Sequence, residues 1–247
     1  MAAGAIVMTA DDILAAALQY AQRGWVIHRL HSPHSKESRA PGKAPVDAGW
    51  TKKSEPPSEH QIRKWFTSEN DYSVGLLCGR VSGVTVIDVD DTLFMYGVDV
   101  SKLDTLMSAR TKGRGHIFFK YNPNLKSCKH HDLGIEVLND GNNAVLPPST
   151  HTSGDVYRWR DPDADLAEMP RWFEDWLLAL FEADTRLKRI LGKCRPCFRL
   201  IFKDRRALNF HGATGREGML ALCTELVANG AAPADIQFLA KINTFAT

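Results

Sequence analysis

Residues 84–91 read VTVIDVDD, a nearly continuous apolar run that ends in acidic residues. A run of this length that is rich in Val and Ile predicts a buried β-strand. Asp88 and Asp90 are two positions apart, so their side chains should project from the same face of that strand. Two carboxylates this close repel each other, and a bound Mg²⁺ or Mn²⁺ would remove that penalty. The stretch therefore predicts a strand that ends in a metal site, although solvated acids at a strand end would give the same pattern.

Further strands are expected on both sides of this stretch, because short apolar runs bounded by turn residues recur along the chain. These runs are residues 24–30, 73–79, 115–121, 134–139, 143–149 and 156–159. Helical periodicity predicts helices over residues 9–23, 58–66 and 217–230, and from about residues 164 and 233 onward. The order of elements predicts an α/β catalytic domain with a mixed β-sheet over residues 1–185, followed by a small all-helical domain over residues 186–247.

The composition excludes several classes of protein. Hydrophobic residues make up 44% of the 247 residues, too many for a wholly disordered chain. The formal net charge of +2 argues against a protein whose whole surface is basic. We read no signal peptide and no apolar run near the ~18 residues that span a bilayer, so no membrane contact is expected. Five cysteines, an odd number, favour a reducing, cytoplasmic setting over a disulfide scaffold.

The segment KGRGH (112–116) opens the strand after the acidic one. Its two glycines let the backbone approach a ligand closely. The side chains of Lys112, Arg114 and His116 can each donate hydrogen bonds to phosphate oxygens. The segment therefore predicts a phosphate-binding turn, and an exposed basic turn is the plain alternative.

Two later segments add polar side chains at strand positions. Glu136 lies within the apolar run GIEVL and needs a partner there, which a metal shared with Asp88 and Asp90 would supply. A solvent-facing Glu in an alternating strand is the alternative. The segment PPSTH then places Ser149 and His151 at a rigid strand end, where they either bind phosphates or form the turn.

A hydrophobic strand followed by DxDxT (88–92) is also the opening motif of haloacid-dehalogenase-type phosphatases. In that family Asp88 would be the nucleophile and Asp90 the general acid or base. The segment NDGNN (139–143) even resembles that family's late acidic loop. However, 87 residues precede the motif here, and no convincing lysine motif lies between the two acidic segments. The phosphatase therefore remains an alternative.

In chain order, the motifs are an apolar strand with DxD, a GxH strand, an acid within a strand, PPSxH and YxW. This order and spacing resemble the archaeo-eukaryotic primase superfamily, most closely the bifunctional primase-polymerase (prim-pol) domain of phage and plasmid replication proteins. The segments GWVIHRL (24–30), GKAP (42–45) and IRKWF (62–66) are similar to the opening of that family. The resemblance covers about residues 10–160 and implies an archaeo-eukaryotic primase-like catalytic domain.

The resemblance implies a template-dependent DNA primase and polymerase that works by two-metal nucleotidyl transfer with Mg²⁺ or Mn²⁺. Its substrates would be dNTPs or NTPs, and its partners a single-stranded DNA template, a primer strand and, in phage or plasmid replication, a helicase. The positions that match the family's catalytic and metal-binding carboxylates are Asp88, Asp90 and Glu136. The positions expected to bind the nucleotide are His116, Lys43, Ser149 and His151, joined on their own chemistry by Lys112 and Arg114. The chain departs from the family at Leu138, where an arginine is frequent.

The C-terminal region resembles the small helical domain that follows the catalytic domain in such proteins. It begins with a basic run that could contact template or primer phosphates, although a solvated helix face would have the same composition. The residues expected to bind nucleic acid are Arg195, Arg199, Lys203 and Arg205. A non-catalytic DNA-binding replication module is the last alternative, and the intact spacing of three acids with GxH disfavours it.

Cys194 and Cys197 form a CxxC pair within this basic run. A structural zinc ion needs four ligands. The rest of the chain offers only a remote partner pair near Cys128, so we expect incidental or buried thiols and no zinc site.

Overall fold

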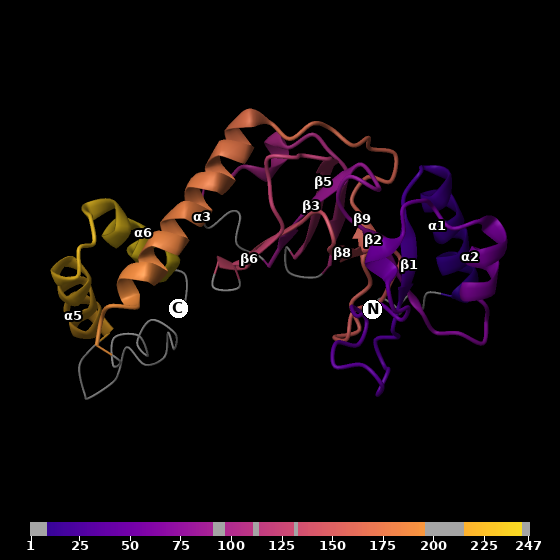
Figure 1. Cartoon of the computed structure of the whole chain (residues 1–247), viewed down its shortest axis with the longest axis horizontal. Coiled ribbons are helices and arrows are strands. Elements are labelled where there is room, and N and C mark those ends of the chain that lie inside the picture. The colour runs from indigo at the N-terminus through magenta and orange to yellow at the C-terminus, as the bar shows by residue number, and fades with distance from the viewer. Residues whose placement is uncertain (1–8, 91–96, 111–113, 131–132, 196–214, 244–247) are drawn as a thin grey trace, which may run out of the picture. The chain divides into compact units, whose positions relative to one another are not determined.

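The computed structural model describes residues 9–90, 97–110, 114–130, 133–195 and 215–243 (Figure 1). Its contacts divide the chain into two compact units. The first, unit 1, contains the described residues up to 90 and residues 99–169. The second, unit 2, contains residues 97–98, 170–195 and 215–243. The architecture confirms the predicted α/β fold with a helical C-terminal region.

Unit 1 combines short helices with β-strands, in the order that the hydrophobic pattern predicts. Its helical segments are α1 (Ala10–Gln22), η1 (Trp50–Lys52), α2 (Glu59–Trp65) and η3 (Val100–Lys102). The strands expected from the sequence are β1 (Ile27–Leu30), β2 (Ser73–Leu77), β3 (Val84–Val89), β5 (Gly115–Lys120), β7 (Ile135–Leu138), β8 (Asn143–Val145) and β9 (Arg158–Trp159). Two three-residue strands were not expected: β4 (Met107–Ala109) and β6 (Cys128–His130).

The strands form two sheets. The smaller has the order β1-β2-β8, and the larger has the order β6-β7-β3-β5-β4-β9. All seven ladders between the described strands are antiparallel, and the expected mixed character is limited to one isolated parallel bridge between Phe119 and Ala167. β3, which carries the acidic motif, lies in the larger sheet between β5 and β7.

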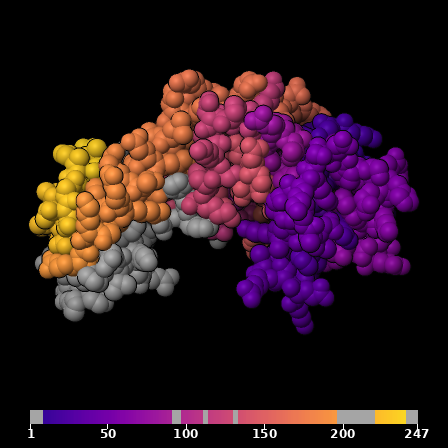
Figure 2. All heavy atoms as spheres, viewed as in Figure 1, coloured from indigo at the N-terminus to yellow at the C-terminus, as the bar shows by residue number. Residues whose placement is uncertain are grey.

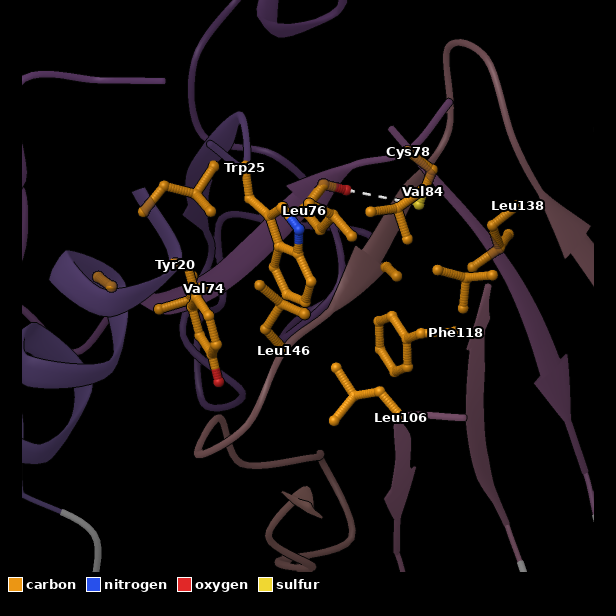
Figure 3. Packing of buried hydrophobic residues seen from close by; sticks show 14 of the residues in the cluster. Tyr20, Trp25, Val74, Leu76, Cys78, Val84, Leu106, Phe118, Leu138 and Leu146 are labelled. Atoms are coloured by element: carbon orange, nitrogen blue, oxygen red, sulfur yellow. Dashed lines mark hydrogen bonds between the residues drawn. The ribbon is translucent and has the colours of Figure 1, made fainter. Parts of the chain in front are cut away.

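The main hydrophobic core of unit 1 draws on both sheets and on the helices beside them. In Figure 3 the side chains of Leu76 from β2, Val84 from β3 and Phe118 from β5 lie around one apolar centre. The ring of Phe118 is fully buried and stacks on Trp25, with ring centroids 6.2 Å apart. It also meets Trp159 edge-on at 5.0 Å. This core therefore supports the central strands that carry the acidic motif.

The helices α1 and α2 pack against each other, and α1 also packs against β1 and β2 (Figure 1). Each begins after a residue whose hydroxyl caps its first turn. The Thr9 hydroxyl accepts a hydrogen bond from the backbone of Asp12, whose carboxylate in turn accepts one from the Thr9 backbone. The Ser58 hydroxyl accepts a hydrogen bond from the backbone of Gln61 at the start of α2. Such caps satisfy amide groups that a helix start leaves without partners.

The long segment between β1 and α2 is irregular apart from η1, and part of it projects from unit 1 (Figure 2). Polar contacts tie this segment to the fold. Arg29 forms an ion pair with Asp47 and lies over the rings of Trp65 and Tyr72, at 5.7 and 5.1 Å. Lys53 lies 4.4 Å from the centroid of the Trp65 ring. Cations over aromatic faces are attracted by the ring quadrupole, so these contacts hold a loop of this length in place.

His28 is a buried titratable group in β1. Its side chain is fully buried against the Trp50 ring, and neither ring nitrogen has a hydrogen-bond partner among the described residues. Burial, together with the nearby charge of Lys53, lowers the pKa of His28 to about 3, although Asp47 acts in the opposite direction. The folded protein therefore holds His28 neutral, whereas the unfolded chain binds a proton near the ordinary value of 6.5.

We therefore expect the protein to lose stability as the pH falls below 6.5. Between that value and the folded-state pKa, only the unfolded state binds the proton, so His28 contributes a loss of up to about 1.4 kcal/mol per pH unit. Urea unfolding between pH 7 and pH 4 should give a shallower slope for His28→Leu than for the wild type. The exposed His60 offers a matched control, since His60→Leu should retain the wild-type slope. Equal slopes for wild type and His28→Leu would contradict this assignment.

Unit 2 is helical in its described part. Its helices are α3 (Arg171–Leu191), α5 (Gly215–Ala228) and α6 (Pro233–Asn243). Arg186 in α3 donates a hydrogen bond of 2.5 Å to the buried carboxylate of Asp235 in α6. The domain boundary predicted between residues 185 and 186 lies inside α3. Among the described residues, no helix has the length and apolar character needed to cross a bilayer.

Candidate active site

The pairing of the larger sheet aligns four polar residues in one row. Asp88 of β3 lies directly opposite Glu136 of β7 on one side and opposite His116 of β5 on the other. His116 in turn lies opposite Ser108 of β4. Directly opposed residues in antiparallel strands share a face, with Cβ atoms about 5 Å apart. The structure therefore brings Asp88, His116 and Glu136 together on one face of the sheet, although they are 20 to 48 positions apart in the sequence.

Asp90 lies next to this row, directly after the end of β3. Its backbone amide donates a 2.8 Å hydrogen bond to the Gly134 carbonyl, which continues the pairing of β3 with β7. Asp90 follows Asp88 by two residues, so both carboxylates lie on the same face, as the DxD spacing predicts. The side chain of Asp90 is 56% exposed, whereas that of Asp88 is 26% exposed. The face is therefore open to solvent at the Asp90 end.

His116 is buried beneath these acids. Its Nε2 lies 3.5 Å from a carboxylate oxygen of Asp88, and its side chain is only 4% exposed. Burial lowers the pKa of His116, and the nearby charges of Lys43 and Arg110 lower it further, against the opposing effect of Asp88. A hydrogen bond with the Val145 backbone also acts to raise this pKa, but the net shift favours the neutral imidazole, which carries a single ring N–H.

Two of the three acids lie beside a cationic side chain, whereas Asp88 lies beside the neutral imidazole of His116. Asp90 is 3.5 Å from Arg110 and 3.8 Å from Arg114, and Glu136 is 3.8 Å from Lys129. Within the described part of the chain, no three acidic, histidine or cysteine side chains converge closely enough to ligate one ion. Mg²⁺, however, commonly binds through one or two carboxylates together with water and substrate phosphates. The oxygen donors of this face fit such an ion chemically, with phosphates completing its ligands.

A basic group borders the acids. The charges of Lys43 and Arg110 lower the pKa of His151 as well as that of His116, although burial is the larger cause for both. The charge of Arg114 also acts on His151. Lys43 and Arg110 therefore lie close enough to both histidines, and Arg114 close enough to His151, to act on them electrostatically. Such a group can neutralise a polyphosphate and donate several hydrogen bonds to it.

The loop that carries Lys43 is held next to the PPSTH turn. Gly42 has a φ of 72°, and a Cβ there would lie 3.5 Å from the carbonyl oxygen of Thr150. The Lys43 carbonyl accepts a 3.1 Å hydrogen bond from the side chain of Asn143 in β8. These contacts place the GKAP segment against the strand end that leads to His151, as expected for a loop that lines the site.

Ser149 takes the second of the two roles that the sequence allowed, because its hydroxyl helps to form the turn. It is fully buried, and its hydroxyl accepts a 2.9 Å hydrogen bond from the backbone amide of Val74. The same hydroxyl lies 3.5 Å from the Val74 carbonyl. The serine therefore ties the PPSTH turn to β2, while His151, two residues later, lies among the basic side chains.

The structure gives a placement for only some of the other predicted residues. Lys112, Arg199, Lys203, Arg205 and Cys197 lie outside the described residues. Arg195 donates hydrogen bonds of 3.0 and 3.2 Å to the carboxylate of Glu225, which balances its charge within unit 2. Cys194 is buried, with its thiol 3.5 Å from the Ile190 carbonyl.

Two further residues belong to the site and were not predicted. Arg110 has a side chain that is only 7% exposed, and it lies beside Asp90 and over the ring of Tyr157 at 5.5 Å. Arg110 directly follows β4, a strand too short to give a recognisable pattern. Tyr157 was noted only as part of YxW, where its spacing gives no sign that its ring stacks on His116.

The arrangement speaks against the phosphatase alternative. Asn139, in the loop that resembles the phosphatase motif, receives a 3.3 Å hydrogen bond from Thr85, near the start of β3. Thr85 and Asp88 are three residues apart, or about 10 Å along the strand. The loop therefore lies beyond the reach needed to act with Asp88, and its Asp140 instead accepts a hydrogen bond from the Arg80 backbone.

Comparison with known proteins agrees with the geometry. The family model described as "Bifunctional DNA primase/polymerase, N-terminal" matches residues 17–172, more than half of the chain. No curated protein matches the chain in sequence. The matched range contains the three acids, His116, Lys43 and His151. The chain belongs to the Prim-Pol family of bifunctional DNA primase/polymerases.

Proposed function

We propose that this protein is a template-dependent primase and DNA polymerase that makes and extends primers by two-metal nucleotidyl transfer. The observation that carries the proposal is the row of Glu136, Asp88 and His116 across three neighbouring strands. Acids that could hold metal ions and a donor that could hold phosphate meet there on one face. Membership of the Prim-Pol family supports the same reaction.

The carboxylates of Asp88, Asp90 and Glu136 would hold two Mg²⁺ or Mn²⁺ ions. When bound, such ions lower the pKa of a primer 3′-hydroxyl and offset the charge of the leaving pyrophosphate. No side chain then needs to form a covalent bond to the substrate, because nucleotidyl transfer depends mainly on positioning and charge. Asp90 must exchange its contacts with Arg110 and Arg114 for the metal, which frees both guanidinium groups for phosphate.

The basic group would bind the triphosphate of the incoming nucleotide. Neutral His116 donates its ring N–H to a phosphate oxygen without adding charge beside Asp88. Lys43, Arg114 and His151 offer further donors, and Lys112 is proposed to join them. The template and primer would bind in part to the basic residues of the C-terminal region, including Arg199, Lys203 and Arg205.

The proposal includes a biological setting and a substrate class. A replication role in a phage or plasmid, with a helicase as a partner, would fit an enzyme that starts new strands. Both dNTPs and NTPs are proposed as substrates, since priming and extension call for either.

Template-directed incorporation is the direct test. A labelled primer is annealed to four templates that differ only in the first unpaired base, and each dNTP is supplied alone with Mg²⁺ or Mn²⁺. We expect the wild type to add only the nucleotide complementary to each template, and to make new strands on unprimed single-stranded DNA. Addition that ignores the template would overturn the proposal, as would phosphomonoester hydrolysis without extension. DNA binding without any incorporation would instead support a non-catalytic module.

A further inference from the structure

Tyr157 has an unusual place in unit 1, directly before β9. Its side chain is 2% exposed and packs with Leu30 and Val145 in a small apolar cluster. Burial raises the pKa of its hydroxyl far above the ordinary value, so the phenol stays protonated. Its role in the site must therefore come from the ring or from a neutral hydroxyl.

The Tyr157 ring contacts three side chains of the basic group. It stacks on the His116 imidazole, with centroids 5.4 Å apart and planes 20° from parallel. It meets His151 edge-on, with centroids 6.3 Å apart. The guanidinium carbon of Arg110 lies 5.5 Å from the ring centroid. One buried ring therefore touches side chains from β5, from the turn after β8 and from the end of β4.

Such contacts restrict how these three side chains can turn. Aromatic stacking and cation–π attraction each favour one placement of the partner over the ring. The ring itself is fixed by burial, since a close-packed environment leaves it little freedom to rotate. A phosphate-binding group gains affinity when its donors are held in place before the ligand arrives.

We propose that Tyr157 is a positioning residue that holds His116, His151 and Arg110 in the arrangement that binds the triphosphate of the incoming nucleotide. The proposal rests on the proposed function for the identity of that ligand. Tyr157 acts through the three side chains and makes no contact with the substrate in this role. Arg110 is the member of this group that contacts both Tyr157 and Asp90.

The test measures equilibrium binding of dATP and dAMP to the full chain. Tyr157→Leu removes the ring and should weaken dATP binding about tenfold, with little change for dAMP. Tyr157→Phe keeps the ring and should restore dATP binding. If Tyr157 acts through His116, the loss from Tyr157→Leu should be much smaller when His116→Ala is already present, because coupled residues are not additive.

Tyr121 offers a matched control. It also carries an arginine over its ring at 5.5 Å, that of Arg80, but it follows the end of β5 remote from His116. Tyr121→Leu should therefore leave the preference for dATP over dAMP as in the wild type, and urea unfolding of each variant reports any general loss of fold.

The outcomes separate this inference from the proposed function. Extension by the wild type reports the proposed function alone, whereas nucleotide binding by the variants reports the role of Tyr157. The inference is overturned if Tyr157→Leu binds dATP as tightly as the wild type, or if Tyr157→Phe loses as much affinity as Tyr157→Leu. It is also overturned if the loss is the same with and without His116→Ala.

Discussion

Replacing Asp88 by Asn is expected to reduce primer extension by about 10³-fold. Asp88 is the centre of the row that pairs with Glu136 and His116, and Asn offers a neutral amide where the proposed metals need a charged oxygen ligand. Metal ions supply several kcal/mol of stabilisation to a charged transition state, and each 1.36 kcal/mol corresponds to a factor of ten in rate. Single-turnover extension of a labelled primer measures this loss directly.

Asp163→Asn is the matched control, because it makes the same substitution at an exposed position of unit 1. It should leave extension unchanged. Binding of primer-template DNA should be similar for both variants, and excess EDTA should stop extension by the wild type. Extension by Asp88→Asn within tenfold of the wild type would show that the carboxylate is not a metal ligand.

Replacing Phe118 by Ala is expected to lower the free energy of unfolding by about 3–5 kcal/mol. Phe118 is fully buried and packs between the rings of Trp25 and Trp159, so its removal leaves a cavity that stacked rings cannot easily fill. Domains commonly have only about 5–15 kcal/mol of stability, so the variant should unfold at much lower urea concentration. Urea unfolding, monitored by tryptophan fluorescence, gives the difference in the free energy of unfolding between the variant and the wild type.

Val81→Ala is the control for this change, because Val81 is an exposed hydrophobic residue of the same unit. Its effect should stay within about 0.5 kcal/mol. Phe118 also meets His116 edge-on at 5.9 Å, so a surviving Phe118→Ala variant should bind nucleotide less well. A loss of stability below 1 kcal/mol would mean that the ring is not part of the main core.

The central strand and its neighbours could be predicted because each is four to six residues long and contains at least three apolar side chains. The strands β4 and β6 are three residues long, and their pattern is set by pairing with β5 and β7, which no local signal reveals. Strand direction was also not determined by local pattern, so the antiparallel character of the ladders emerged only from the structure.

In the site too, some residues could be predicted from the sequence and others could not. Asp88, Asp90, Glu136 and His116 were predicted together, because strand periodicity and family resemblance both mark them. Ser149 matched a motif, but its hydroxyl is bonded to the backbone of Val74, a contact between distant segments. Arg110 and Tyr157 were missed because their importance lies in side-chain contacts across the sheet.

The alignment of Glu136, Asp88 and His116 depends on strand pairing. A single residue inserted within a strand would therefore disrupt the site, whereas a change in the length of a connecting loop would not. An added residue in the connection between two strands leaves the row intact, because hydrogen bonds between β3 and its neighbours still set which residues face each other. An added residue inside β3 shifts every later side chain to the opposite face, and carries the acids away from their partners. Evolution within such an enzyme is therefore free to lengthen its loops, whereas the strands themselves can change only by substitution.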